Sequence, residues 1–323
     1  MSTILDQAVS FGVESTYGTS VAPTRSFEAQ ADIATKKVEF LESKGFRAGI
    51  SSVRSDRRTI IDMGGEGTLE ADILTKGFGL LLQGMFSTSA ISAQAATSAY
   101  KQTFTATGAA PTKSYTAQVL RADSGGTLRT FTYAGTTFTG WEIGIEQGGL
   151  LNIKADLDVR TELTGPSATA TSYPTSTVPW DWSQAVATIN GNASAVSKFS
   201  LKADLGMHVE RRYLQGSALK AQPIRKSLPS YEGTIELDYA DTTFYTMFTA
   251  GSVVPITLTC TGSNIASTYY YTFKITLPAC QFTGETPKSS FDDLTKQALP
   301  FVVLDDGTNA PVTVEYTSID VAL

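Results

Sequence analysis

The chain has 323 residues, of which 41% are hydrophobic and 17% charged, so it is long enough for two globular domains and too apolar for a disordered protein. Its formal net charge is −6, from 25 basic and 31 acidic residues. That balance argues against a surface built to bind phosphate groups, because such surfaces depend on clustered lysine and arginine.

The beginning of the chain lacks a sustained hydrophobic period. Residues 1–26 are rich in Gly, Ser, Thr and Pro, so we expect an N-terminal arm that is a loop or an extended tail. The first expected strands are residues 27–33 and 38–41. Residues 43–65 then contain several glycines and arginines, which predict a long hairpin or a mobile loop.

A strand with strict alternation follows at residues 66–73, EGTLEADI, and returns at residues 232–239, EGTIELDY. Side chains alternate between the faces of a strand, so each copy has one acidic and one apolar face. We expect Leu69 and Ile73 in the first copy, and Ile235 and Leu237 in the second, to pack under the helix that follows. The acidic face carries Glu66, Glu70, Asp72, Glu232, Glu236 and Asp238.

The first expected helix covers residues 75–86, with Thr75 as a possible N-cap. Phe78, Leu81, Leu82 and Met85 fall on one stripe of that helix. Residues 87–112 are rich in Ser, Ala and Thr and are interpreted as an inserted loop. Strands are expected at residues 114–120, 127–133, 136–141 and 150–159.

A linker is expected at residues 161–183, because residues 161–179 hold three prolines and few bulky aliphatic side chains. Trp180 and Trp182 follow the proline-rich part and are expected to pack against a domain surface.

The second half repeats the order of features of the first. Residues 199–205, FSLKADL, match residues 27–33, FEAQADI, and residues 215–230 form a second basic excursion. A second helix follows the second acidic strand, with Asp241 as N-cap and Gly251 just after its end. Residues 282–284 match residues 138–140, FTG in both. We therefore predict an internal duplication, with domains at residues 27–160 and 184–323.

Recognisable catalytic and metal-binding patterns are missing. His208 is the only histidine and has no accompanying nucleophile motif, and no phosphate-binding loop or EF-hand spacing occurs. Cys260 and Cys280 lack zinc-ligand spacing and lie in apolar runs, so we expect two reduced, buried thiols. No export signal is apparent at the N-terminus. We expect no enzyme, no metal and no cofactor.

The basic excursions leave two interpretations open: solubilised loops, or loops that dock on an acidic surface of a neighbouring copy of the same protein. A nucleic-acid patch is a weaker interpretation, because aromatic side chains for base stacking are not interleaved. The residues concerned are Arg47, Arg54, Arg57, Arg58, Lys220, Arg225 and Lys226.

Three features of the chain resemble the tail tube (major tail) proteins of long-tailed bacteriophages. They are the opening segment FGVESTYGTSVAPTRSFE, the strand-then-helix unit EGTLEADILTKGFGLLLQGMF, and the duplication, which is similar to members with two tube domains in one chain. The insertion at residues 87–112 departs from the family pattern.

The resemblance implies a mainly β protein, with two tandem β-barrel or sandwich domains that each carry one flanking α-helix. It implies homotrimeric rings with six tube domains, stacked into a tube that conducts the DNA genome during ejection. Residues 43–65 and 215–230 correspond to the hairpin that reaches a neighbouring ring or subunit. The resemblance further implies that other tail proteins bind at the tube ends and that assembly takes place in the host cytoplasm. It also implies a place in the virion tail without a sheath, and no membrane contact.

We expect the acidic faces of the two repeats to line the channel, where like charge keeps the DNA backbone from sticking. The alternative function is a β-sandwich module for carbohydrate binding or adhesion, which needs exposed aromatic platforms. A glycoside hydrolase that uses paired carboxylates ranks last, because the acidic residues share a solvated strand face with threonine.

Overall fold

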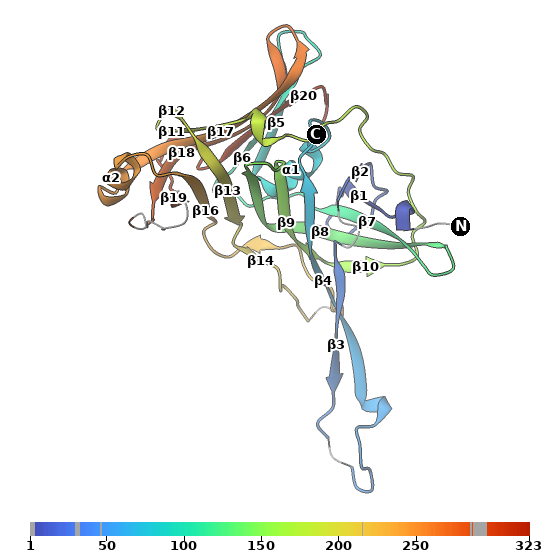
Figure 1. Cartoon of the computed structure of the whole chain (residues 1–323). Coiled ribbons are helices and arrows are strands. Elements are labelled where there is room, and N and C mark those ends of the chain that lie inside the picture. The colour runs from blue at the N-terminus through green and yellow to red at the C-terminus, as the bar shows by residue number, and fades with distance from the viewer. Residues whose placement is uncertain (1–3, 30–32, 46, 215, 285, 287–295) are drawn as a thin grey trace.

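The computed structural model describes residues 4–29, 33–45, 47–214, 216–284, 286 and 296–323, and the chain is mainly β (Figure 1). In the first half, a four-stranded antiparallel sheet has the order β8-β9-β4-β3. Its strands are β3 (Thr35–Glu42), β4 (Arg58–Asp72), β8 (Leu128–Glu146) and β9 (Asn152–Val159). The mainly β expectation is confirmed.

The second half builds the same order of strands, β18-β19-β16-β13. These strands are β13 (Val196–Asp204), β16 (Ser230–Asp238), β18 (Tyr269–Phe282) and β19 (Lys296–Val303). In both halves the acidic strand, β4 or β16, lies second from the end.

Strand pairing supports the sequence repeat residue by residue. Three residues face one another across the first sheet, and the residues predicted to match them do the same in the second sheet. The two rows are Gly67–Leu157–Phe138 and Gly233–Phe301–Phe282. The proposed match between residues 27–33 and 199–205 is wrong, because it makes position 30 the counterpart of Lys202. Lys202 lies opposite Glu232, and the residue opposite the equivalent Glu66 is Thr35.

The two sheets join within the chain into one continuous sheet. Strand β13 of the second half pairs with β8 of the first, from Lys198 opposite Glu146 to Asp204 opposite Gly140. The order is therefore β18-β19-β16-β13-β8-β9-β4-β3. Alternation buries one face of it: Leu69, Ile143 and Leu201 are inaccessible to solvent. A single hydrophobic cluster extends through both halves.

A second layer extends from the long strands β8 and β18, which each take part in two layers. In the first half it contains β7 (Tyr115–Ala122), β1 (Ala8–Val13), β2 (Arg25–Phe27) and β10 (Thr161–Leu163). In the second half it contains β17 (Val253–Ala266), β11 (Ala185–Ile189), β12 (Asn192–Ser194) and β20 (Thr313–Ser318).

Strand β1 corrects the expected N-terminal arm. Residues 8–13 pair with β7, as β11 pairs with β17 in the second half, and Phe11 is fully buried. The Gly-, Ser- and Thr-rich composition conceals this strand, because its burial depends on partners more than 100 residues away. The domain boundaries at residues 27–160 and 184–323 stay a prediction.

The insertion at residues 87–112 is a hairpin and not a loop. Strands β5 (Thr88–Ala93) and β6 (Tyr100–Thr105) pair with each other, and β6 pairs with β20 near the C-terminus. Phe104 and Gln102 are buried in that contact. The insertion therefore fastens the first half to the second through the outer layer.

Both expected helices exist but are short. Helix α1 (Gly79–Met85) begins four residues later than expected, because Gly77 has φ +90°, which a helix does not tolerate. The Thr75 hydroxyl instead accepts a hydrogen bond from the Val178 amide. The predicted apolar stripe is buried, as expected. Helix α2 (Thr243–Thr249) follows the Asp241 side chain, which accepts a hydrogen bond from the Thr243 amide.

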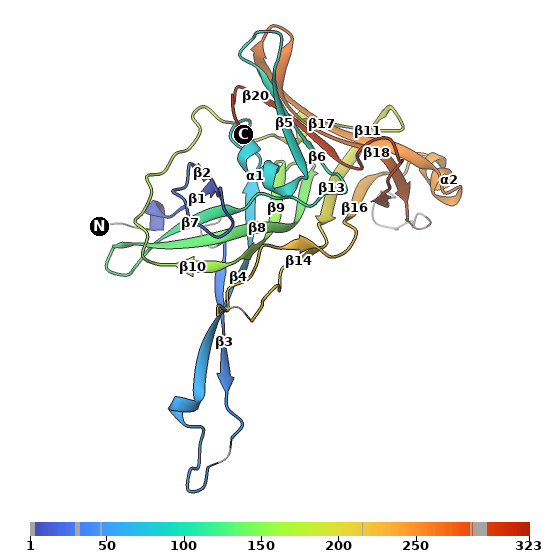
Figure 2. The same cartoon turned by 180° about the vertical axis from the view of Figure 1, so that it is seen from behind.

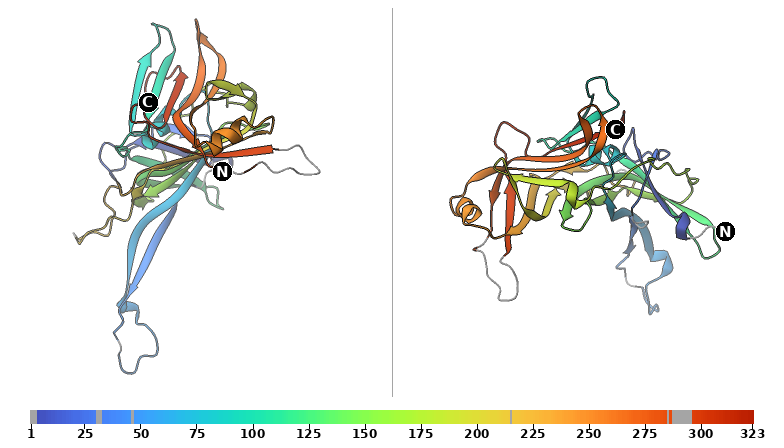
Figure 3. Two further views of the ribbon diagram at one scale, coloured as in Figure 1. Left: turned by 90° about the vertical axis from the view of Figure 1, so that its left-hand side faces the viewer. Right: turned by 45° about the horizontal axis from the view of Figure 1, so that its top comes forward.

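The linker runs along the first half. Its backbone accepts hydrogen bonds from the amides of Ser26 and Leu151 and forms an isolated β-bridge with Leu74. Trp180 is fully buried, whereas Trp182 is 47% exposed. Two ends of the molecule protrude: the β3–β4 hairpin on one side, and the neighbouring tips of β5–β6 and β17–β18 on the other (Figures 1 and 2). Seen from the side, the β3–β4 hairpin stands clear of the body (Figure 3).

Candidate functional site

The six predicted acidic residues lie on one face of the continuous sheet. Glu66, Asp72, Glu232 and Asp238 are exposed, and Glu70 and Glu236 are partly exposed. Their odd-numbered neighbours Leu69, Ile73, Ile235 and Leu237 are buried, so the face assignment from alternation holds in both copies. We refer to this surface, formed by the outward side chains of β4, β9, β8, β13, β16 and β19, as the polar face.

Lysines alternate with the carboxylates on the polar face. The strand registers place one row of charges across five strands, in the order Glu70, Lys154, Glu142, Lys202 and Glu232. Opposite charges on directly facing positions of a sheet stabilise it modestly. The Lys154 ammonium lies 2.8 Å from a Glu70 carboxylate oxygen, and that contact raises the pKa of Lys154.

The polar face is nevertheless acidic. Its accessible carboxylates are Glu66, Glu70, Asp72, Glu142, Glu146, Asp156, Asp204, Glu232, Glu236 and Asp238, and its lysines are Lys154, Lys198, Lys202 and Lys296. The sequence prediction missed these lysines, although the alternation of β9 and β13 would have placed them beside the acidic strands. A surface of this charge repels polyanions at long range, while its lysines keep part of the charge paired.

The predicted basic residues of the first half lie on the β3–β4 hairpin, which is the hairpin expected at residues 43–65. Arg47, Arg57 and Arg58 are exposed, and Arg54 forms a 2.6 Å ion pair with Asp56. Arg58 pairs with Glu42 at 3.0 Å and stacks over Phe40 at 4.0 Å from the ring centre.

The same hairpin exposes apolar side chains. Phe40 lies opposite Ile60 in the strand register, and they are 49% and 60% exposed. Leu41 and Val53 are also more than half exposed. A protruding hairpin that combines arginines with exposed apolar side chains is a typical contact element for another protein surface.

The corresponding segment of the second half folds back, and this corrects one predicted site residue. Lys220 is only 3% exposed, and its ammonium lies 2.5 Å from Asp158 of the first half. Burial raises the pKa of Asp158, and the Lys220 ammonium opposes that effect. Lys220 therefore serves a contact within the chain and is removed from the set of intersubunit candidates.

The described residues of 205–229, which exclude position 215 and are here called the clasp, hold the two halves together at several further points. The Arg212 guanidinium donates to the Met63 carbonyl at 2.8 Å, and the Gln222 amide donates to the Thr112 carbonyl at 3.1 Å. Arg225 donates to the carbonyls of Thr107 and Gly108. Of the three basic residues predicted here, Lys226 is the exposed one.

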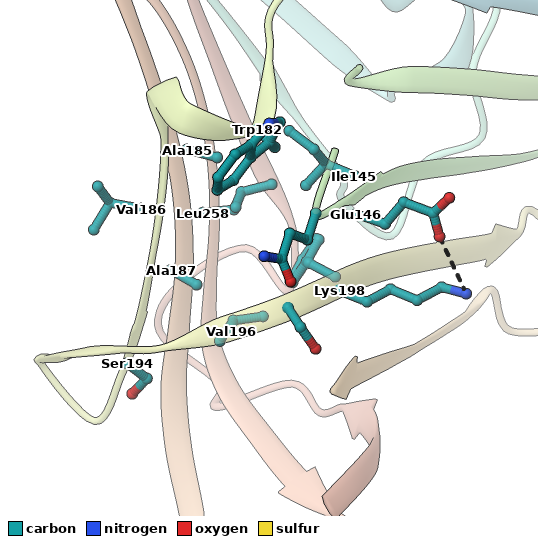
Figure 4. Close-up of a pocket in the computed structure, with 13 residues that line it drawn as sticks. Ile145, Glu146, Trp182, Ala185, Val186, Ala187, Ser194, Val196, Lys198 and Leu258 are labelled. Atoms are coloured by element: carbon teal, nitrogen blue, oxygen red, sulfur yellow. Dashed lines mark ion pairs between the residues drawn. The ribbon is translucent and has the colours of Figure 1, made fainter. Parts of the chain in front are cut away.

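A pocket of about 190 Å³ lies where β8 and β13 meet, beside Trp182 (Figure 4). Ile145, Val196 and Leu258 give it an apolar wall, and the Lys198–Glu146 ion pair of 3.8 Å lies at its rim. None of its described lining side chains is a buried polar group without a hydrogen-bond partner. No buried, unpartnered side chain in this pocket therefore indicates a particular ligand.

The described part of the chain contains no group of three His, Cys, Asp or Glu side chains placed to hold a metal ion. His208 lies exposed on β14 (Met207–His208), which pairs with β15 (Ile224–Arg225). Cys260 and Cys280 are both buried and not bonded to each other, and burial raises the pKa of each to about 12. Among the described helices, none has the length and apolar character needed to cross a membrane.

Comparison with known proteins gives one family. A protein-family model described as "Phage tail tube protein" matches residues 5–303, which is nearly the whole chain. No protein with a curated description matches.

Proposed function

Since the chain belongs to the phage tail tube protein family and is therefore a structural protein of the phage tail, we propose that copies of it form stacked rings around a channel that conducts the DNA genome. The observation that carries this proposal is the continuous sheet in which the second half pairs edge to edge with the first. Edge strands that pair in this way favour repetition of the same contact, and closure into a ring removes the last free edges.

Two repeats in one chain favour a ring of three chains. The family resemblance implies six tube domains in a ring, and each chain contributes two equivalent sheets with matched registers. A head-to-tail contact that closes after three copies is a heterologous interface that ends within its plane. We propose β1–β10 and β11–β20 as the two tube domains, with β1 and β2 assigned to the first domain instead of to an arm.

The polar face is the surface that we assign to the channel. Carboxylates outnumber lysines on it ten to four in the described strands, so a passing phosphate backbone meets net repulsion. The cross-strand lysines keep part of that charge paired, which limits self-repulsion of the assembled wall. The DNA would slide without specific binding.

The β3–β4 hairpin is the element that we assign to contacts between rings. Its exposed Phe40 and Ile60 and its arginines suit a partner surface, and it protrudes on the side opposite the neighbouring tips of β5–β6 and β17–β18 (Figure 1). In a stack, these two ends of successive copies would face each other. Absence of a sheath and location in the virion tail follow from the family resemblance as further parts of the proposal.

Negative-stain electron microscopy of the purified protein tests the proposal, with mass photometry of the unpolymerised fraction beside it. Tubes or stacked rings, and particles of three chains, are the expected results. A protein that stays a monomer over a wide range of concentration, salt and pH would contradict it.

A further inference from the structure

The β3–β4 hairpin leaves the body of the molecule at one point of strand β4. Residues 65–72 of β4 pair with β9 in the continuous sheet, and residues 58–62 pair with β3 beyond the end of β9. All of β3 and the first residues of β4 are exposed, and the hairpin stands clear of the body (Figure 3). The direction of the hairpin therefore depends on the two residues between these ranges, Met63 and Gly64.

Met63 and Gly64 form a β-bulge. The register of β3 against β4 shifts at this point, so that the two residues together face the single residue Lys37 of β3. Gly64 has φ +77°, a backbone conformation that favours glycine. A bulge bends its strand and increases the local twist, so a change of conformation at this bulge would swing the whole hairpin.

Two contacts within the hairpin shape the bulge. The Asp62 carboxylate accepts a hydrogen bond from the Gly64 amide at 2.8 Å, and its other oxygen lies 3.0 Å from the Lys36 ammonium. Both side chains of this ion pair are partly exposed, so water weakens it. Because both contacts lie inside the hairpin, they hold its local turn without linking it to the body.

Arg212 of the clasp links the bulge to the second half of the chain. Its guanidinium donates through Nη2 to the Met63 carbonyl at 2.8 Å. Through Nε it donates to the Ala218 carbonyl at 3.2 Å, and through Nη1 it pairs with Glu210. The rigid fork of donors thus braces one atom of the bulge against two points of the clasp. Hydrogen bonds from a charged donor are about twice as strong as those between neutral groups.

The clasp is itself anchored on the first half, so it forms a fixed support for this brace. The buried Lys220 ammonium lies 2.5 Å from Asp158 at the end of β9, and Arg225 donates to the Thr107 carbonyl at 3.2 Å. The clasp also packs against the bulge directly, because a Cβ built on Gly64 would lie 3.0 Å from Cε of Lys220.

We propose that Met63 and Gly64 are the hinge of the β3–β4 hairpin and that Arg212 is the positioning residue that fixes the direction of the hairpin. Through the clasp, the second half of the chain aims the hairpin of the first half. The consequence for assembly rests on the proposed function, because a hairpin already held in one direction loses less freedom when it contacts a neighbouring copy. The hinge itself is a property of the single chain and is tested there.

Double electron–electron resonance on the unpolymerised chain measures the direction of the hairpin. Nitroxide labels are attached to Thr59→Cys, exposed on the hairpin, and to Asn152→Cys, exposed on β9 opposite Asp72. At about 3.3 Å per residue along β4, the two sites lie about 40 Å apart, a separation suited to this measurement. The native thiols are buried and stay unlabelled. We expect one narrow distance distribution, which Arg212→Ala should widen at least about twofold because the bulge loses its brace.

Arg211→Ala is the matched control, because Arg211 donates to Gln222 and Tyr213 within the clasp. It should leave the distance distribution as narrow as in the parent. Equal widths for the parent and Arg212→Ala, or equal widening by Arg211→Ala, would overturn the inference.

Arg212→Lys covers the case in which Arg212→Ala fails to fold. Lysine keeps the positive charge but lacks the planar fork that reaches Met63 and Glu210 together, so it should also widen the distribution. A folded Arg212→Lys protein with the parental width would overturn the inference.

Electron microscopy of the unlabelled Arg212→Ala and Arg211→Ala variants tests the consequence for assembly. If the aimed direction falls to about a tenth of the population, the protein concentration needed for tubes rises about tenfold. We expect this rise for Arg212→Ala and none for Arg211→Ala. Tubes of Arg212→Ala at the parental concentration would overturn the role of the hinge in assembly. Absence of tubes from the unmodified chain would instead refute the proposed function, and the distance measurement would still decide the hinge.

Discussion

The buried Lys220–Asp158 ion pair links the clasp to the first half, and Lys220→Met tests what that link contributes. The two side chains are 4% and 6% exposed, and the ammonium lies 2.5 Å from the carboxylate oxygen. Removal of the lysine takes away the cation that contacts the buried carboxylate. Arg212 also acts on Asp158, but its guanidinium pairs with Glu210. Breaking a buried pair in this way costs about 3–5 kcal/mol.

The loss of folding stability caused by Lys220→Met should increase with pH. Without the ammonium, burial remains the largest influence on Asp158 and holds its folded-state pKa above the ordinary value, although the Arg212 guanidinium acts against it. Below a pH of about 4 the carboxyl is protonated in both folded and unfolded states, so the variant loses little stability. As pH rises through the folded-state pKa of Asp158, the folded state must ionise a buried group and the loss grows to its full value.

Chemical denaturation of the unpolymerised protein at pH 4 and pH 7 measures this difference. We expect Lys220→Met to lose about 3–5 kcal/mol at pH 7 and clearly less at pH 4. Lys226→Met, an exposed lysine of the same clasp, should change stability by less than about 0.5 kcal/mol. Asp158→Asn combined with Lys220→Met should recover most of the loss, because no buried charge remains. A Lys220→Met protein as stable as the parent at pH 7 would show that the buried ion pair does not stabilise the fold.

Three further predictions concern the polar face, the hairpin and the packing of the sheet. A triple variant converts the charge row to five lysines: Glu70→Lys, Glu142→Lys and Glu232→Lys. In co-sedimentation, its tubes should bind duplex DNA at low salt and release it as salt rises. Equal binding by unmodified tubes would contradict the channel assignment. Phe40→Ser with Ile60→Ser should abolish stacking in micrographs with little change in melting temperature, whereas Val321→Ser, also exposed, should leave stacking intact. Gly67→Ala should destabilise the fold by about 3 kcal/mol in chemical denaturation, since its Cβ would lie 1.9 Å from the Ile33 carbonyl oxygen, and Gly165→Ala should be neutral.

The elements that could be predicted from the sequence are those whose hydrophobic pattern is visible within a few residues. The EGT segments alternate strictly, and the structure gives both the same register against their partner strands. The apolar stripe of α1 is likewise a local pattern, and all four of its residues are buried. Local alternation and helical period were sufficient to place these elements.

Strand β1 and the β5–β6 hairpin were missed because distant partners make them strands. Phe11 is buried through pairing with β7, and Phe104 through pairing with β20, some 200 residues further along the chain. Their sequences are rich in Ser, Ala, Thr and Gly, which on their own favour loops. The charge of Lys220 was misleading for the same reason, since only the fold shows that Asp158 lies within 2.5 Å.

The polar face illustrates a third limit. Glu70 and Glu232 could be assigned to one face from the strands that carry them, but the lysines opposite them, Lys154 and Lys202, come from other strands. Side-by-side order and register across a sheet follow from packing of the whole chain. The sequence therefore indicated an acidic surface, and the fold shows a surface on which charges alternate.

A cryo-electron microscopy reconstruction of tubes assembled from the purified chain would place the polar face relative to the channel. We expect rings of three chains, with β4 and β16 in a continuous wall whose polar face, including Glu70 and Glu236, surrounds the channel. Rings in which Glu70 and Glu236 lie on the outer surface would contradict the channel assignment, and an assembly without a closed ring would contradict the proposed function.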